Sequence, residues 1–290
     1  MSIFNKKINL DFEIIKEFLS LSTLVYDLGF DLNFMKDSSN NFDLKSLDIS
    51  KLKLNERRKK QLLEVISESP NAELYKFYDL PSGNQVGITI SHIKKRIAFV
   101  FRGSNEIMDW LHNFLICKKE VKENCYVHLG FYKSLTANNL LDNLTYDLKI
   151  LLEKYNNYEI FITGHSLGGG LSTLFGYLMS DIIDKNITVV TYASPRVGNY
   201  QWCNDFNCKK NLRLYRIVNK CDTVTAIPYM YFYHVGNHIY IDEKNMTFTE
   251  FDKFEDNNNV IKSYNPLDHF IENYYENLSK CKWCKDIELI

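Results

Sequence analysis

The fold is decided by the stretch EIFITGHSLGGGLSTLFGYLMSDII, residues 159–183. It opens with β-branched and aromatic residues, which are typical of a buried strand, and closes with an apolar segment of helical length. Between them, Gly164, Ser166 and Gly168 match the pattern G-x-S-x-G, in which a serine occupies a strained turn between strand and helix. The helix start directs backbone N–H groups towards whatever this serine attacks. The alternative is a glycine-rich turn that serves only packing.

On both sides of this stretch, strand patterns alternate with helical patterns. Strand patterns lie at 85–92, 96–103, 187–194 and 212–219, and helical patterns lie at 11–30, 130–155 and 200–208. Such alternation is typical of βαβ units. We therefore expect an α/β fold, with a mainly parallel central sheet flanked by helices and an N-terminal helical extension.

The composition fits one large domain. The chain has 290 residues, of which 45% are apolar and 24% charged, and this balance excludes a wholly disordered or fibrous protein. We expect a single domain over residues 1–290, with a mostly helical, polar extension at 1–75 and the core at 76–280. The basic run at 51–60 is best interpreted as a solvated helix face, and the alternative is a contact for phosphate or lipid head groups.

Charge and hydropathy limit the partners and the compartment. The formal net charge is -1, so no global field attracts nucleic acid. No apolar run reaches the ~18 residues that span a bilayer, and the N-terminal residues lack a signal-peptide core. Seven cysteines, an odd number, indicate at least one free thiol. We therefore expect a cytoplasmic protein, with secretion by another route left open.

A serine hydroxyl becomes a good nucleophile only when a base takes its proton and a third group orients that base. After a G-x-S-x-G serine, the partners follow in the order Asp or Glu, then His. Asp222 directly follows a strand pattern, and His269 lies near the C-terminus, beside Asp268, which is a candidate cap for the following helix. His234 and His238 also follow Asp222, but their alternating strand pattern favours packing or rim roles.

An anion pocket is expected at a second strand tip. Acyl transfer needs two hydrogen-bond donors that face the oxygen of the tetrahedral intermediate. The backbone N–H of Leu167, which follows the proposed nucleophile, is one candidate. The other is the N–H of Ser104, directly after the strand pattern at 96–103.

The segment NEIMDWLHNFLI at 105–116 predicts a short amphipathic helix beside that pocket. Its apolar positions recur at helical spacing and form one stripe: Ile107, Trp110, Leu111, Phe114 and Leu115. A helix of this kind could cover the site in water and open on lipid. An ordinary helix fixed on the core gives the same pattern, and both interpretations stay open.

Seven motifs together resemble the class 3 lipase family, the fungal-type triacylglycerol lipases and their relatives. They are FRGSNEIMDW (101–110), VHLGFYKS (127–134), GHSLGGGLS (164–172), YASPRVGN (192–199), RIVNKCDTVTAIP (216–228), YHVGNHIY (233–240) and LDHFIENY (267–274). The resemblance implies an α/β-hydrolase fold with Ser166, Asp222 and His269 as catalytic triad. It also implies an oxyanion hole at Ser104 and Leu167, and Trp110 in a mobile lid.

The expected function is hydrolysis of lipid carboxylic esters, such as triacylglycerol or diacylglycerol, through an acyl-enzyme intermediate. An esterase or phospholipase A1 with a fixed flap is one alternative, and a catalytically silent lipid-binding protein is another. The partners would be a lipid or other ester substrate and, transiently, a membrane or lipid-droplet surface. The aromatic run at 229–233, beside Asp222, is either a lining of the acyl groove or a buried strand or loop.

No cofactor or metal is expected, because no motif asks for a catalytic metal, a nucleotide or a redox group. Four thiolates could in principle hold zinc: Cys203, Cys208, Cys281 and Cys284. The first pair is spaced too widely for a typical zinc site, so free thiols or an oxidised C-terminal pair are favoured.

Overall fold

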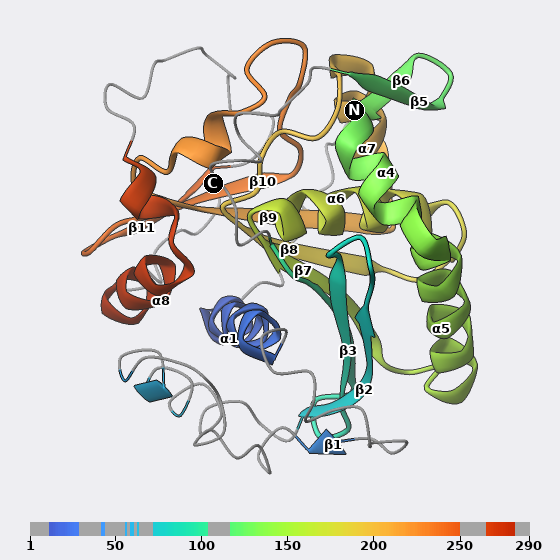
Figure 1. Ribbon diagram of the computed structural model, residues 1–290, viewed down its shortest axis with the longest axis horizontal. Coiled ribbons are helices and arrows are strands. Elements are labelled where there is room, and N and C mark those ends of the chain that lie inside the picture. Colours follow the sequence, from blue (N-terminus) through green and yellow to red (C-terminus); the bar gives the residue numbers. More distant parts are fainter. Residues whose placement is uncertain are drawn as a thin grey trace, which may run out of the picture.

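The computed structural model describes residues 12–28, 42–43, 56, 59–60, 63, 72–103, 117–249 and 265–281. A twisted sheet runs through the middle, with helices on both faces (Figure 1). The helices are α1 (Phe12–Leu28), α4 (Leu129–Thr136), α5 (Leu140–Lys154), α6 (Leu167–Ser180), α7 (Tyr200–Cys208) and α8 (Ile271–Lys280), with 3-10 helices η4 (Ala137–Asn139), η5 (Thr223–Ala226) and η7 (Pro266–His269).

Within the described residues, one sheet has nine strands in the order β1-β2-β3-β4-β7-β8-β9-β10-β11. Its strands are β1 (Phe42–Asp43), β2 (Ala72–Asp79), β3 (Gln85–Ser91), β4 (Arg96–Phe101), β7 (Glu159–His165), β8 (Ile187–Tyr192), β9 (Leu212–Asn219), β10 (Asn237–Ile241) and β11 (Met246–Thr249). The central strands β4, β7, β8, β9 and β10 run parallel, and the outer pairs are antiparallel. A separate hairpin joins β5 (Lys118–Lys122) to β6 (Cys125–His128). The predicted α/β class is confirmed.

Each face of the sheet has its own apolar core. On one face, α1 and α8 pack against inward side chains of β4, β7, β8, β9 and β10. On the other face, α4, α5, α6 and α7 cover the alternate side chains of β4, β7, β8 and β9, together with side chains of β3. This alternation follows from the strand period of two, because successive side chains point to opposite faces. Both helical layers are visible in Figure 1.

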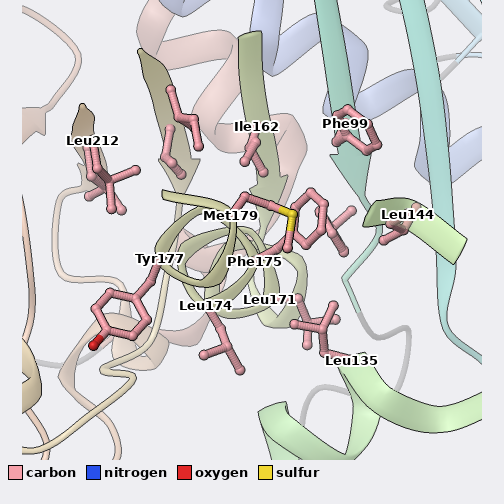
Figure 2. Packing of buried hydrophobic residues seen from close by; sticks show 14 of the residues in the cluster. Phe99, Leu135, Leu144, Ile162, Leu171, Leu174, Phe175, Tyr177, Met179 and Leu212 are labelled. Carbon is pink, nitrogen blue, oxygen red and sulfur yellow. The ribbon is translucent and has the colours of Figure 1, made fainter. Parts of the chain in front are cut away.

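Helix α6 lies at the centre of the second core. It is buried on nearly all sides, as expected for a helix with little polar surface. Figure 2 shows its side chains Leu171, Leu174, Phe175 and Met179 surrounded by residues from neighbouring strands and helices. The proposed nucleophile Ser166 directly precedes α6, so this packing fixes the position of the turn.

Two elements differ from the sequence prediction. The helical pattern at 130–155 is interrupted, because Asn138 and Asn139 adopt left-handed φ values of 52° and 58° that a helix cannot contain. Asparagine tolerates this conformation better than most residues. The strand expected at 233–241 begins only at Asn237, since Tyr233 pairs with Gly198 and Gly236 turns the chain at a φ of 70°.

The N-terminal segment contributes one strand to the sheet and one helix to the layer that packs on it. Helix α1 packs on β4 and β7 through Phe18, whose ring stacks on Phe161 at 4.5 Å, and β1 pairs with β2. The division of the single domain into an extension at 1–75 and a core at 76–280 stays a prediction, since only parts of 1–75 lie among the described residues. Among the described helices, none combines the length and the apolar character that a membrane span requires.

We predict that Phe175→Ala lowers the free energy of unfolding by about 3–5 kcal/mol, because it opens a cavity against Phe99 and Phe101 in a fully buried site. Tyr146→Ala is the control: this side chain is exposed on α5, and its loss should change stability by less than about 0.5 kcal/mol. Urea unfolding measures both. Equal effects of the two changes would contradict the assignment of the core.

Candidate active site

Ser166 sits on a strained turn between β7 and α6. Its φ of 59° and ψ of -126° lie in a region that residues with a side chain rarely adopt. The turn is held by a bond from the Ser166 N–H to the Tyr192 carbonyl, 2.9 Å long. Strand and helix meet so closely that a Cβ on Gly164 would lie 2.5 Å from the Gly168 carbonyl oxygen. Only glycine fits this approach, so the sequence pattern and the geometry agree.

Three side chains from distant parts of the chain form a continuous hydrogen-bonded row. The His269 Nε2 lies 2.9 Å from the Ser166 Oγ. The His269 Nδ1 lies 2.9 and 3.0 Å from the two carboxylate oxygens of Asp222. All three side chains are buried. The structure thus brings together the three residues that the sequence selected as nucleophile, base and orienting acid.

This row defines the imidazole tautomer. A carboxylate can only accept, so the His269 Nδ1 carries a proton and donates it to Asp222. The Nε2 lone pair is then left to accept the Ser166 hydroxyl proton. Arranged in this way, the imidazole can take a proton from the serine, and the Asp222 carboxylate stabilises the imidazolium that forms.

Asp222 has two further donors, and neither was predicted from the sequence. The Val224 N–H donates to its Oδ1 at 2.9 Å, and the Tyr274 hydroxyl donates to its Oδ2 at 2.7 Å. Burial and the nearby Asp222 charge raise the pKa of Tyr274 well above its ordinary value, so the hydroxyl keeps its proton. Tyr274 lies one helical turn into α8, which no sequence motif connects to Asp222.

The backbone around His269 is also held by side chains from the sheet. The His165 Nε2–H donates to the His269 carbonyl at 2.8 Å, and the Asn219 amide donates to the Asp268 carbonyl at 2.8 Å. The Asp268 carboxylate accepts the Cys221 N–H at 3.2 Å. Helix α8, for which Asp268 was a candidate cap, has Phe270 at its N-cap and no side-chain capping bond, so that prediction is wrong.

The proposed anion pocket is only partly covered by the described residues. Leu167 is the first residue of α6, and its backbone N–H has no acceptor within the helix, as at every helix start. The tip of β4 lies beside it, since a Cβ on Gly168 would collide with the Phe101 carbonyl. The remaining predicted residues of the pocket and lid lie outside the described residues: Ser104, Ile107, Trp110, Leu111, Phe114 and Leu115.

The two rival histidines have other environments. The His234 Nε2–H donates to the Thr225 carbonyl at 2.7 Å. Burial, together with the Arg216 and Arg196 charges, lowers the pKa of His234 well below its ordinary value. Burial and Arg216 lower the pKa of His238 to about 2. Both imidazoles therefore stay neutral, which fits the packing roles that the sequence predicted.

The row from Ser166 through His269 to Asp222 contains no cysteine side chain. Among the described cysteines, Cys117, Cys125, Cys208 and Cys281 carry free thiols, and the buried Cys281 Sγ donates to the Asp242 carbonyl at 2.8 Å. Cys284 lies outside the described residues. Within the parts of the chain that the structure describes, no group of three or more His, Cys, Asp or Glu side chains is arranged to hold a metal ion.

The fold and this row define a class of proteins. A serine on a turn between a parallel strand and a helix, followed along the chain by Asp and then His, is the arrangement of the α/β-hydrolases. Residues 98–232 match the sequence model of the family described as Lipase (class 3). Over this stretch, which is just under half of its length, the chain resembles the class 3 lipases.

Individual relatives match parts of the chain. Secreted mono- and diacylglycerol lipase A of Penicillium cyclopium is 27% identical over 176 residues, which cover 59% of this chain and 56% of that protein. Phospholipase A1-IIgamma of Arabidopsis thaliana is 28% identical over 182 residues, covering 52% and 43%. The chain thus spans about half the length of these relatives. The structure of Rhizomucor miehei triacylglyceride lipase superposes with a TM-score of 0.71, covering 93% of this chain and 95% of that one, and its 19% identity makes this a likeness of fold.

The comparisons overturn the expected compartment. The sequence predicts a cytoplasmic protein, because its N-terminal residues lack a signal-peptide core. The Penicillium cyclopium relative and others of the same kind are named as secreted, and this contradicts the cytoplasmic prediction. The physical reason for the error is that a hydrophobicity pattern reports on the residues present and carries no record of the export route.

We predict that Tyr274→Phe slows labelling of Ser166 by a fluorophosphonate about tenfold, because Asp222 loses a buried donor worth about 1.4 kcal/mol in positioning His269. Tyr177→Phe is the matched control, since it removes a similar hydroxyl from Asp205 on α7, 2.8 Å away. Labelling rates at equal protein concentration measure both. Slowing by both variants alike would indicate a purely structural effect.

We also predict that stability falls in acid. Below about pH 6.5 the unfolded chain protonates His234 and His238, whereas the folded chain does not, so the unfolded state binds more protons. These two histidines should therefore leave the free energy of unfolding unchanged above that pH. Below that pH, each histidine should lower the free energy of unfolding by up to about 1.4 kcal/mol per pH unit. Urea unfolding at several pH values tests this, and His238→Asn should flatten the slope. An unchanged slope would refute the assignment.

Proposed function

We propose that the protein is a serine hydrolase that cleaves carboxylic esters of lipids through an acyl-enzyme intermediate. The observation that carries this proposal is the row of hydrogen bonds from Ser166 through His269 to Asp222, 2.9 Å at each step. The match of residues 98–232 to class 3 lipases supports the same reaction. The burial of all three side chains also supports it, because electrostatic interactions are stronger away from water.

In the acylation half of the reaction, the Ser166 Oγ attacks the ester carbonyl carbon while the His269 Nε2 takes the hydroxyl proton. Asp222 holds the Nδ1–H and stabilises the positive imidazolium. The carbonyl oxygen becomes an oxyanion, which the Leu167 N–H and, in this proposal, the Ser104 N–H bind. Collapse of the intermediate breaks the ester C–O bond, and His269 returns its proton to the leaving alcohol.

In the second half, water replaces the alcohol. His269 takes a proton from water, and the resulting hydroxide attacks the acyl carbon that is bonded to Ser166. The oxyanion forms again in the same pocket, and collapse releases the carboxylic acid while His269 protonates the Ser166 oxygen. All protons and electron pairs are then back in their starting places, so the cycle requires no further reactant.

The substrate class is proposed from the relatives. Their names include mono- and diacylglycerol lipase and phospholipase A1, which share an acyl ester of glycerol. We place glycerolipid esters first and soluble esters second. A lipid substrate implies transient contact with a lipid surface, and the segment of Ile107, Trp110, Leu111 and Phe114 is proposed as the lid that moves there.

We predict that Asp222→Asn lowers kcat on a glyceride ester by about 10⁴-fold, because the amide holds the wrong imidazole tautomer. Asp268→Asn is the matched control: this neighbouring carboxylate bonds the Cys221 N–H and has no proposed part in the reaction. The kcat of Asp268→Asn should fall much less than that of Asp222→Asn. A larger loss of kcat in Asp268→Asn than in Asp222→Asn would show that Asp222 is not the acid of the triad.

The class of enzyme is tested with a fluorophosphonate probe and a substrate series. Wild type should be labelled covalently, Ser166→Ala and heat-denatured protein should not, and equal labelling of Ser166→Ala would reject the proposed nucleophile. With a short-chain triglyceride, a lipase predicts a sharp rise in rate above the solubility limit. Smooth saturation would favour the esterase with a fixed flap.

A further inference from the structure

Three consecutive large side chains lie on the surface of the connection between β9 and β10. Tyr229, Met230 and Tyr231 are 56%, 55% and 65% exposed. The next residue, Phe232, is only 1% exposed, and its ring packs on the buried His128 at 5.5 Å. The loop is therefore anchored by Phe232 while its preceding three side chains face water. Adjacent exposed apolar groups of this size are a feature of interaction surfaces.

Cationic side chains flank this exposed trio. The Lys118 ammonium lies 4.6 Å from the centre of the Tyr231 ring, and Lys118 itself is exposed at the start of β5. The Arg196 guanidinium lies 5.9 Å from the Tyr229 ring and donates to the Tyr229 carbonyl at 3.4 Å. These two cations and Tyr229, Met230 and Tyr231 form what we name the aromatic-cationic patch.

Two acidic groups on or beside the hairpin that carries Lys118 accept hydrogen bonds from other residues. On the hairpin that carries Lys118, the Glu120 carboxylate accepts the Asn124 N–H at 2.9 Å. Asp205 accepts from Lys122 at 2.5 Å and from Tyr177 at 2.8 Å. The patch itself combines aromatic and apolar side chains with the positive charges of Lys118 and Arg196.

The patch lies on the same edge of the sheet as the proposed active site. Arg196 belongs to the loop after β8. In the same loop, Ser194 lies close to the start of α6, since a Cβ on Gly169 would be 2.9 Å from the Ser194 Cβ. Tyr229 comes shortly after η5, whose N-cap residue is Asp222. Strands β8 and β9 run parallel, so both loops leave the sheet at the edge where the strands end.

We propose that the aromatic-cationic patch docks the protein on a lipid surface with anionic head groups. Tyrosine, with an apolar ring and a polar hydroxyl, is enriched at the boundary between water and lipid. Lysine and arginine beside it attract the negative charge of acidic phospholipids. This proposal rests on the proposed function and adds two points to it. It names the surface that turns the active-site edge of the sheet towards the lipid, and it names the charge of that lipid.

The charge pattern favours lipid over a second copy of the chain. Two copies that met through this patch would bring Lys118 and Arg196 of each together, and like charges repel. An anionic bilayer instead offers negative groups beside an apolar layer, which matches both parts of the patch. A self-associating surface is therefore an outcome that the experiment must be able to detect.

The test uses the full chain with Ser166→Ala, so that the vesicles stay intact and binding is measured apart from hydrolysis. Sedimentation is carried out with phosphatidylcholine vesicles, with and without phosphatidylglycerol. Binding should require phosphatidylglycerol and weaken with added salt. In this background, Lys118→Gln should reduce the partition coefficient about fivefold, as expected for one basic charge near an anionic surface. Tyr231→Ser should reduce it by a similar factor.

Matched controls are available on α5, which carries no part of the patch. Lys149→Gln removes one exposed lysine, and Tyr146→Ser removes a tyrosine that is 65% exposed, like Tyr231. Neither should change binding. Equal binding to both kinds of vesicle, no binding at all, or equal losses in the α5 controls would overturn the proposal. Loss of a dimer in Tyr231→Ser would assign the patch to self-association instead.

The same variants separate this proposal from the proposed function. With Ser166 restored, Lys118→Gln should hydrolyse a soluble short-chain aryl ester at the wild-type rate, because Lys118 has no proposed part in the reaction. If wild type fails to cleave that ester while anionic vesicles still bind the patch, the hydrolase proposal fails and the docking proposal stands. If wild type cleaves that ester but does not bind anionic vesicles more strongly than neutral ones, the docking proposal fails and the hydrolase proposal stands.

Discussion

The structure depends on the close approach between the end of β7 and the start of α6. The two backbones approach so closely that Gly164 and Gly168 leave no space for a side chain, and Ser166 takes a positive φ between them. Strain of this kind persists only where the surroundings fix it. Here the surroundings are β8, through the Tyr192 carbonyl, and the buried helix α6 with its many apolar contacts.

The other two members of the row depend on the opposite layer of the protein. Asp222 follows β9, and His269 ends the short turn before α8, the helix that packs with α1 on the first face of the sheet. His165, Asn219 and Tyr274 then connect β7, β9 and α8 around these two residues. The geometry of the site therefore rests on both cores at once. A change in either core that shifts one of these elements should disturb the distance between His269 and Ser166.

The sequence predicted most of what it could encode locally. The strand, turn and helix at 159–183 carry their own signals. The order of Asp222 and His269 along the chain selected them as partners of Ser166, and the structure places the three side chains in one hydrogen-bonded row. The support from Tyr274 and His165 was missed, because hydrogen bonds between distant segments leave no periodic pattern. The helix interruption at Asn138 had a signal, two adjacent asparagines, which the stronger leucine pattern outweighed. Ser104 and the predicted lid remain predictions.

The central claim is that His269 holds its Nδ1 proton against Asp222 and so presents a lone pair to Ser166. Proton NMR of the folded protein measures this directly, since a proton shared between imidazole and a buried carboxylate resonates far downfield. The account predicts such a signal in the wild type and in Asp268→Asn, and its loss in Asp222→Asn and in His269→Gln. Persistence of the signal in a folded Asp222→Asn variant would contradict the account.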